Sequence, residues 1–203
     1  MAKASHSEGE TSNAFGRASH AEGRDTKAIG GYSHAEGRLT EAGYAAHAEG
    51  YNTKANGHWS HAEGKDTTAS GIASHVEGEG TTASNTASHA EGYGSGAEGN
   101  YSHAEGNGTV ASGEQAHAEG YDTEAIGNES HAEGSATQAL GGSTHAEGNH
   151  TCAYKFGSHA EGRYTIAKGF YSHAEGKSTY AGAVPPGKEE DAKKETLNGN
   201  NEW

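Results

Sequence analysis

The chain has 203 residues, of which 31% are hydrophobic and 33 are glycine, and its 28 acidic residues outnumber 14 basic ones. This composition excludes a conventional apolar core, and the net charge of −14 argues against nucleic acid as a partner, because phosphate binding needs a basic patch. Low hydrophobicity with high net charge is typical of disorder. A strict internal repeat nevertheless indicates an ordered structure, because a disordered chain has no reason to keep a constant period.

A five-residue phrase, most often Ser-His-Ala-Glu-Gly, recurs thirteen times, with its histidines fourteen residues apart in all but one interval. A second phrase, Thr-x-Ala-x-Gly, begins six residues after each histidine, as in Thr26–Gly30. The one interval of thirteen residues, from His34 to His47, falls on the second phrase Thr40–Gly43, which lacks a variable residue. Such a repeat predicts a solenoid that absorbs the deletion as a local bulge or a tightened corner.

Both phrases are predicted to be short β-strands, because residues i, i+2 and i+4 of a strand share one face. Ser, Ala and Gly of the first phrase and Thr, Ala and Gly of the second then point inwards. His, Glu and the variable residues point outwards. Two strands joined by two-residue corners close one flattened coil, and coils stacked at ~4.8 Å pair their backbones. Corner glycines are expected to supply positive φ, and a helix is excluded because each glycine costs it about 1 kcal/mol.

The outward column of the second phrase is chemically mixed, since it includes Lys27, Val110 and Cys152. This mixture is typical of a surface that faces solvent. The threonine column beside it, which includes Thr26, is predicted to point inwards. An inward threonine column argues against an ice-binding surface.

The His-Glu face of the first phrase is uniform from end to end, and a uniform face on a rod without a core predicts contact with identical copies. A parallel homotrimer is the simplest closed arrangement, and a dimer is also compatible. A histidine that faces a neighbouring chain's glutamate then satisfies both groups at each level. Acid is expected to change the stability of this seam near pH 6, with either sign open. The predicted trimer-interface residues are His6, Glu8, His20, Glu22, His34, Glu36, His47, Glu49, His61, Glu63, His75, Glu77, His89, Glu91, His103, Glu105, His117, Glu119, His131, Glu133, His145, Glu147, His159, Glu161, His173 and Glu175.

Metal binding is the alternative for these histidines, because a threefold axis brings three imidazoles together as in a three-histidine metal site. We expect no resident metal, since metal sites occur once or twice in a protein and not at every coil. An adventitious metal ion or anion on the axis stays open. We also expect no cofactor, no catalytic residue and no enzymatic activity, because a catalytic site needs unlike residues that converge in a pocket.

Aromatic residues lie at the corners, for example Tyr32 and Trp59 before the phrase serine and Tyr51 after the phrase glycine. They either stack between coils or contact glycans or proteins. No stretch approaches the ~20 apolar residues of a membrane span. No apolar signal-peptide core precedes the first repeat, so we expect either an excised piece of a longer chain or a protein released by lysis. The repeat stops after Ala183, which predicts a β-roll domain over residues 1–183 and a cap, neck or linker over residues 184–203.

The two phrases resemble the fourteen-residue repeats in the head domain of trimeric autotransporter adhesins, over residues 5–183. This resemblance implies a left-handed parallel β-roll of about 13 coils, three chains side by side, and attachment of a cell or virus particle to a surface. Where the adhesin phrase has Val and Ile, this chain has His and Glu, as in Ser33–Gly37. That variant is similar to arrays in phage tail appendages and Gram-positive surface proteins.

The expected function is therefore that of a non-enzymatic structural and adhesive module in a virion tail or on a bacterial cell surface. Its expected partners are itself, as a homotrimer, and a glycan or protein of the host surface. The alternatives are a purely structural spacer in a phage tail fibre and a His-rich metal-binding solenoid.

Overall fold

The computed structural model describes residues 4–182, and every regular element in this range is a β-strand. Five-residue strands alternate with two-residue strands, one of each for every repeat, so the chain is an all-β parallel solenoid of about 13 turns. The residues 4–182 contain no helix with the length and apolar character that a membrane crossing requires. The predicted segment 184–203 lies outside the described residues.

The chain divides into two compact units, Met1–Asn107 and Gly108–Trp203. The five-residue strands of the first unit are β1 His6–Glu10, β3 His20–Arg24, β5 His34–Arg38, β7 His47–Tyr51, β9 His61–Lys65, β11 His75–Glu79, β13 His89–Tyr93 and β15 His103–Asn107. Its two-residue strands are β2 Asn13–Ala14, β4 Lys27–Ala28, β6 Glu41–Ala42, β8 Lys54–Ala55, β10 Thr68–Ala69, β12 Thr82–Ala83 and β14 Gly96–Ala97.

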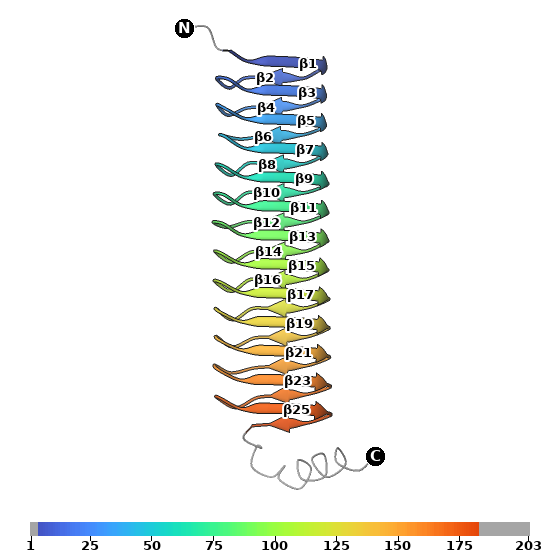
Figure 1. Cartoon of the computed structure of the whole chain (residues 1–203), viewed down its shortest axis with the longest axis vertical. Coiled ribbons are helices and arrows are strands. Elements are labelled where there is room, and N and C mark those ends of the chain that lie inside the picture. Colours follow the sequence, from blue (N-terminus) through green and yellow to red (C-terminus); the bar gives the residue numbers. More distant parts are fainter. Residues whose placement is uncertain (1–3, 183–203) are drawn as a thin grey trace. The chain divides into compact units, whose positions relative to one another are not determined.

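The second unit is built in the same way. Its five-residue strands are β17 His117–Tyr121, β19 His131–Ser135, β21 His145–Asn149, β23 His159–Arg163 and β25 His173–Lys177. Its two-residue strands are β16 Val110–Ala111, β18 Glu124–Ala125, β20 Gln138–Ala139, β22 Cys152–Ala153, β24 Ile166–Ala167 and β26 Tyr180–Ala181. Within each unit the long strands stack in one parallel sheet and the short strands in another (Figure 1).

The interior of each coil holds small side chains only, as the alternation predicts. The strand alanines and the threonines of the second phrase, such as Ala35 and Thr40, are completely buried, and the phrase serines are nearly so. Val76, which replaces an alanine, is the largest side chain among the fully buried ones. The sheets of one coil therefore pack at the distance that alanine and threonine permit.

The thirteen-residue repeat loses its residue from a corner and not from a strand. This confirms the predicted tightened corner rather than a bulge. His34 of β5 stays opposite His47 of β7, and Glu41 of β6 stays opposite Lys54 of β8. The missing residue therefore belongs to the connection between β6 and β7. There the Gly43 amide donates to the Ala55 carbonyl, at 2.7 Å, whereas in the preceding coil the consecutive amides of Ile29 and Gly30 both donate to the Ala42 carbonyl.

The corners differ from the prediction in which residues take up positive φ. Two corner positions in nearly every coil are left-handed, and most of them are not glycine; Asp25 has a φ of 57° and Tyr32 a φ of 61°. Such a residue costs roughly 1–2 kcal/mol, but its amide donates a hydrogen bond to the preceding coil, at 2.8 Å from Tyr32 to the Arg17 carbonyl. This coil-to-coil bond offsets the strain, so the corners do not depend on glycine.

Glycine is required instead where successive coils touch. A Cβ at Gly57 would lie 1.9 Å from the carbonyl oxygen of Gly71 in the next coil. Gly37 combines a φ of +110° with the same close approach, since a Cβ there would lie 2.2 Å from the Gly50 oxygen. The glycines of both phrases therefore set the close stacking of the coils.

Candidate functional site

The first and third positions of every long strand place one histidine and one glutamate on the same outward face. Parallel pairing in register puts each histidine beside the histidine of the next coil and each glutamate beside the next glutamate. We call these two columns, made of the 26 predicted residues, the His-Glu ladder. The structure brings all of them into the predicted columns within each unit.

The imidazole rings of the ladder follow one another at a constant spacing, in parallel stacks at some levels and tilted or edge-on at others. Neighbouring ring centroids lie 4.7–5.0 Å apart in both units, which is the spacing of the strands that carry them. The planes of His34 and His47 differ by only 2°, and those of His89 and His103 by 7°. Close stacking of this kind favours neutral rings, because adjacent charged imidazoles repel one another.

Each histidine also lies against the glutamate of its own phrase. In twelve of the thirteen pairs the Nε2 atom is 3.4–4.0 Å from a carboxylate oxygen of the residue two positions later. In pairs such as His47–Glu49, at 3.6 Å, the ring is half-buried and its Nε2 atom is covered without a close hydrogen bond. From the sequence we expect each histidine to pair with a glutamate of a neighbouring chain. The spacing of two residues between histidine and glutamate in each phrase already indicates that the two can also contact each other within one chain.

Burial shifts the proton equilibria of the ladder in one direction. The pKa values of His47, His89, His131 and His159 lie below the usual 6.5, first because burial disfavours the charged ring and then because flanking histidines repel it. The nearby glutamates act in the opposite direction but more weakly. These rings are therefore neutral at neutral pH.

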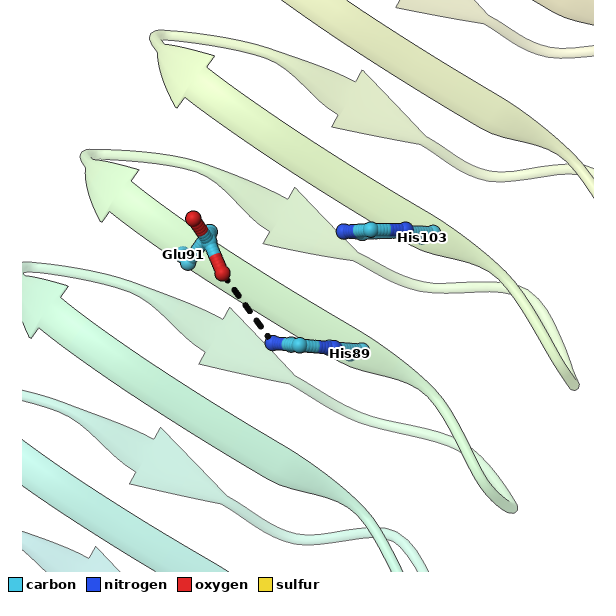
Figure 2. Close-up of side chains that lie close together, drawn as sticks. All are labelled: His89, Glu91 and His103. Carbon is cyan, nitrogen blue, oxygen red and sulfur yellow. Dashed lines mark ion pairs between the residues drawn. The ribbon is translucent and has the colours of Figure 1, made fainter.

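One level of the ladder brings three metal-ligating groups together. The ligand atoms of His89, Glu91 and His103 all lie within 4.8 Å of one another, and all three side chains are half-buried. In Figure 2 the two rings from β13 and β15 lie parallel, with the Glu91 carboxylate beside His89. Two imidazoles and one carboxylate form a donor set that binds transition metals.

The corners form a second exposed surface. In the first unit Tyr44 contacts the rings of Tyr32, His58 and Trp59 from neighbouring coils, with centroid distances of 5.3–6.3 Å. The rings therefore contact one another between coils as predicted, but in edge-on and tilted arrangements and not as parallel stacks. The same aromatic side chains stay exposed, Trp59 by 60%, so their outer faces are open to a partner.

The outward column of the short strands is less uniformly exposed than predicted. Lys27 is exposed, but Cys152 of β22 is only 8% exposed, because Gln138 and Ile166 flank it on the adjacent strands. Burial raises the pKa of the Cys152 thiol. The position faces outwards as predicted, and its neighbours cover it.

No protein-family model matches the chain, and a search of curated proteins finds no significant match. The functional argument therefore rests on the geometry of the ladder and the corners.

Proposed function

We propose that the chain is a non-enzymatic structural and adhesive module whose left-handed β-rolls associate in parallel through the His-Glu ladder as a homotrimer. The observation that carries this proposal is the ladder itself: within each unit, imidazole rings, most of them half-buried, repeat with centroids 4.7–5.0 Å apart, and glutamates form a matching column beside them. A second copy of the chain has the same period and meets this face level by level. Three copies close the arrangement around one axis.

The physical chemistry of the ladder favours such an association. The rings are already ordered by stacking, so a partner chain restricts few side-chain rotamers when it binds. The lowered pKa values of His47 and His131 keep these two rings neutral at neutral pH, which lowers the cost of removing them from water. A coil interior of alanine, serine and threonine supplies little apolar burial, so the lateral contact adds stability that a single chain lacks.

The adhesive part of the proposal rests on the exposed corners. Trp59, Phe170 and Tyr171 are 60–75% exposed, and aromatic side chains of this kind are enriched at binding interfaces because they combine an apolar face with, in tyrosine and tryptophan, a polar group. A rigid trimer repeats each corner three times, so weak contacts with a glycan or protein of a host surface add up. A virion tail or a bacterial cell surface is the setting that fits this role.

The mass of the full chain in solution tests the assembly. Light scattering coupled to size-exclusion chromatography is expected to give three times 20.8 kDa. The double variant Glu49→Lys/Glu63→Lys is expected to dissociate the assembly, because at two adjacent levels it replaces the carboxylate that accepts from a neighbouring chain's imidazole with an ammonium group that cannot accept a hydrogen bond. Lys54→Glu, on the exposed face of β8, is the control and leaves the mass unchanged. A monomer for the unaltered chain contradicts the proposal.

Adhesion needs its own test. The assembled protein is screened against a glycan array and against host cells, with Trp59→Ala and Tyr171→Ala as variants that remove corner rings. We expect binding that one of these variants weakens. A stable trimer that binds no glycan and no cell is a spacer instead.

A further inference from the structure

We propose that His89, Glu91 and His103 bind one divalent transition-metal ion of the zinc class within a single chain. All three residues belong to the first unit and come from two adjacent parallel strands, β13 and β15, whose register sets His89 directly beside His103. Figure 2 shows the two rings one above the other and the Glu91 carboxylate next to His89.

The burial of the Glu91 carboxylate sets this level apart from the other levels of its unit, whereas parallel rings also occur at His34 and His47. The rings of His89 and His103 have centroids 4.7 Å apart and planes within 7° of each other. The Glu91 side chain is 38% exposed, whereas the other ladder glutamates of the first unit are 45–71% exposed. The Glu91 carboxylate is therefore the most covered ladder carboxylate of this unit, and the ligand atoms of His89, Glu91 and His103 lie within 4.8 Å of one another.

The Nε2 atom of His89 has an incomplete environment, which it shares with ladder histidines such as His34 and His47. It is buried, lies 3.5 Å from the nearest Glu91 oxygen and has no hydrogen-bond partner. A buried nitrogen without a partner costs about 1–3 kcal/mol. A metal ion between this nitrogen and the carboxylate satisfies both groups at once.

The donor set specifies the class of ion. Two imidazole nitrogens and one carboxylate oxygen match the His2Glu set of zinc sites, which leaves a fourth position for water. Mg²⁺ and Ca²⁺ prefer oxygen ligands and are disfavoured here. Tetrahedral Zn²⁺ with bonds of about 2.0–2.2 Å needs ligand atoms about 3.3 Å apart. Ligand atoms that now lie within 4.8 Å of one another therefore approach by at most roughly 1.5 Å, through rotation of side chains that are only half-buried.

This site differs from the axial alternative considered from the sequence. Rings of three histidines on a threefold axis bind one ion for every three chains. The site described here takes all three ligands from one chain, so it binds one ion per chain whether or not the chains associate.

The test uses the full chain and adds Zn²⁺ or Co²⁺ after treatment with a chelator. We expect titration calorimetry to give one tight site per chain and Co²⁺ to show the visible absorption of a tetrahedral complex. Glu91→Gln is expected to weaken Zn²⁺ binding at least about 10-fold, since even second-shell changes at such sites cost 10- to 100-fold. The control Glu49→Gln, at an equivalent ladder position of the same unit, leaves the affinity within about 2-fold.

Circular dichroism of each variant verifies that the fold is retained, and Glu91→Asp, which keeps the carboxylate, is expected to restore part of the affinity. One ion per three chains overturns the proposal in favour of an axial ring. Equal weakening by Glu49→Gln and Glu91→Gln, many equivalent ions per chain, or no binding at all also overturns it. None of these outcomes depends on whether the protein is a trimer, so the assembly and the metal site fail or succeed separately.

Discussion

In most coils the hydroxyl group of the phrase serine or threonine forms a hydrogen bond within the corner that precedes the long strand. Two coils have alanine at this position and lack the hydroxyl. At nine corners the phrase serine or threonine donates to the carbonyl oxygen three residues earlier, over 2.6–2.8 Å, as Ser130 does to Gly127. Ala46 and Ala116 occupy the same position without a hydroxyl. We expect Ala116→Ser to stabilise the protein by supplying the missing hydrogen bond.

The magnitude follows from the geometry of the corner. The backbone at Ala116 is already in place, since its amide lies 3.2 Å from the Gly113 oxygen, the same distance as from Ser130 to Gly127. The added hydroxyl therefore forms its bond without moving the chain. A typical net contribution is about 0.5–1.5 kcal/mol, which corresponds to roughly 1–6 °C in melting temperature for a chain of this length.

The opposite change provides the matched measurement. Ser130→Ala is expected to destabilise by about 1 kcal/mol and no more, because the Gly127 carbonyl keeps its bond to the residue 130 amide and is not left without a donor. Ser130→Thr keeps the hydroxyl, as Thr144 does at its own corner with a bond of 2.6 Å, and is expected to be nearly neutral. Thermal and urea unfolding, followed by circular dichroism, measures all three. A loss of stability in Ala116→Ser, or an unchanged stability in Ser130→Ala, refutes the reasoning.

Three further predictions concern glycine, acid and the buried thiol. Gly57→Ala is expected to break the local stacking of coils and expose the chain to protease, because its Cβ would lie 1.9 Å from the Gly71 oxygen. The control Gly94→Ala has open space around the new Cβ at a φ of +64°, so it is expected to cost only about 1–2 kcal/mol. Equal protease resistance of the two variants contradicts this prediction. The free energy of unfolding is expected to fall as the pH drops below 6.5. The pKa values of His47 and His131 are lowered in the folded chain, so the unfolded chain binds protons first. Melting temperatures that stay level or rise as the pH falls contradict this prediction. Cys152 is expected to react slowly with a thiol reagent until urea is added, since it is covered and its pKa is raised; rapid labelling of the folded chain contradicts this.

The coil architecture was predictable because the repeat is strict and the side-chain alternation has a period of two. Small residues at inward positions, such as Ala35 and Thr40, admit one assignment of faces, and the structure buries them completely. The deletion between His34 and His47 was also interpretable, since losing a strand residue would have turned every following side chain to the other face. The register on both sides of the corner is retained.

Three features depended on contacts that the sequence does not encode locally. The left-handed conformation of residues such as Tyr32 is stabilised by an amide bond to the preceding coil, so no glycine marks it. The burial of Cys152 is due to its neighbours Gln138 and Ile166 at the same position of adjacent coils. The grouping at Glu91 results from small differences in ring angle and exposure between levels that are almost identical in sequence.

The lowered histidine pKa values also distinguish assembly through the ladder from assembly through another face. In a single chain the rings are half-buried, and burial is already the largest cause of the shift at His47 and His131. A partner chain that covers the ladder removes more water and lowers these pKa values further. The associated state then binds fewer protons than the separated chains, so acid drives dissociation before it drives unfolding.

Because dissociation depends on mass action, the pH midpoint of that transition is expected to move to lower values as the protein concentration rises. Analytical ultracentrifugation across a range of concentrations between about pH 8 and pH 5 measures this midpoint. The double variant His47→Gln/His131→Gln, which removes two rings with lowered pKa values and leaves the strands intact, is expected to make the transition less steep. A midpoint that is independent of concentration, or an associated state whose acid response is unchanged in this variant, means that the ladder does not form the contact between chains.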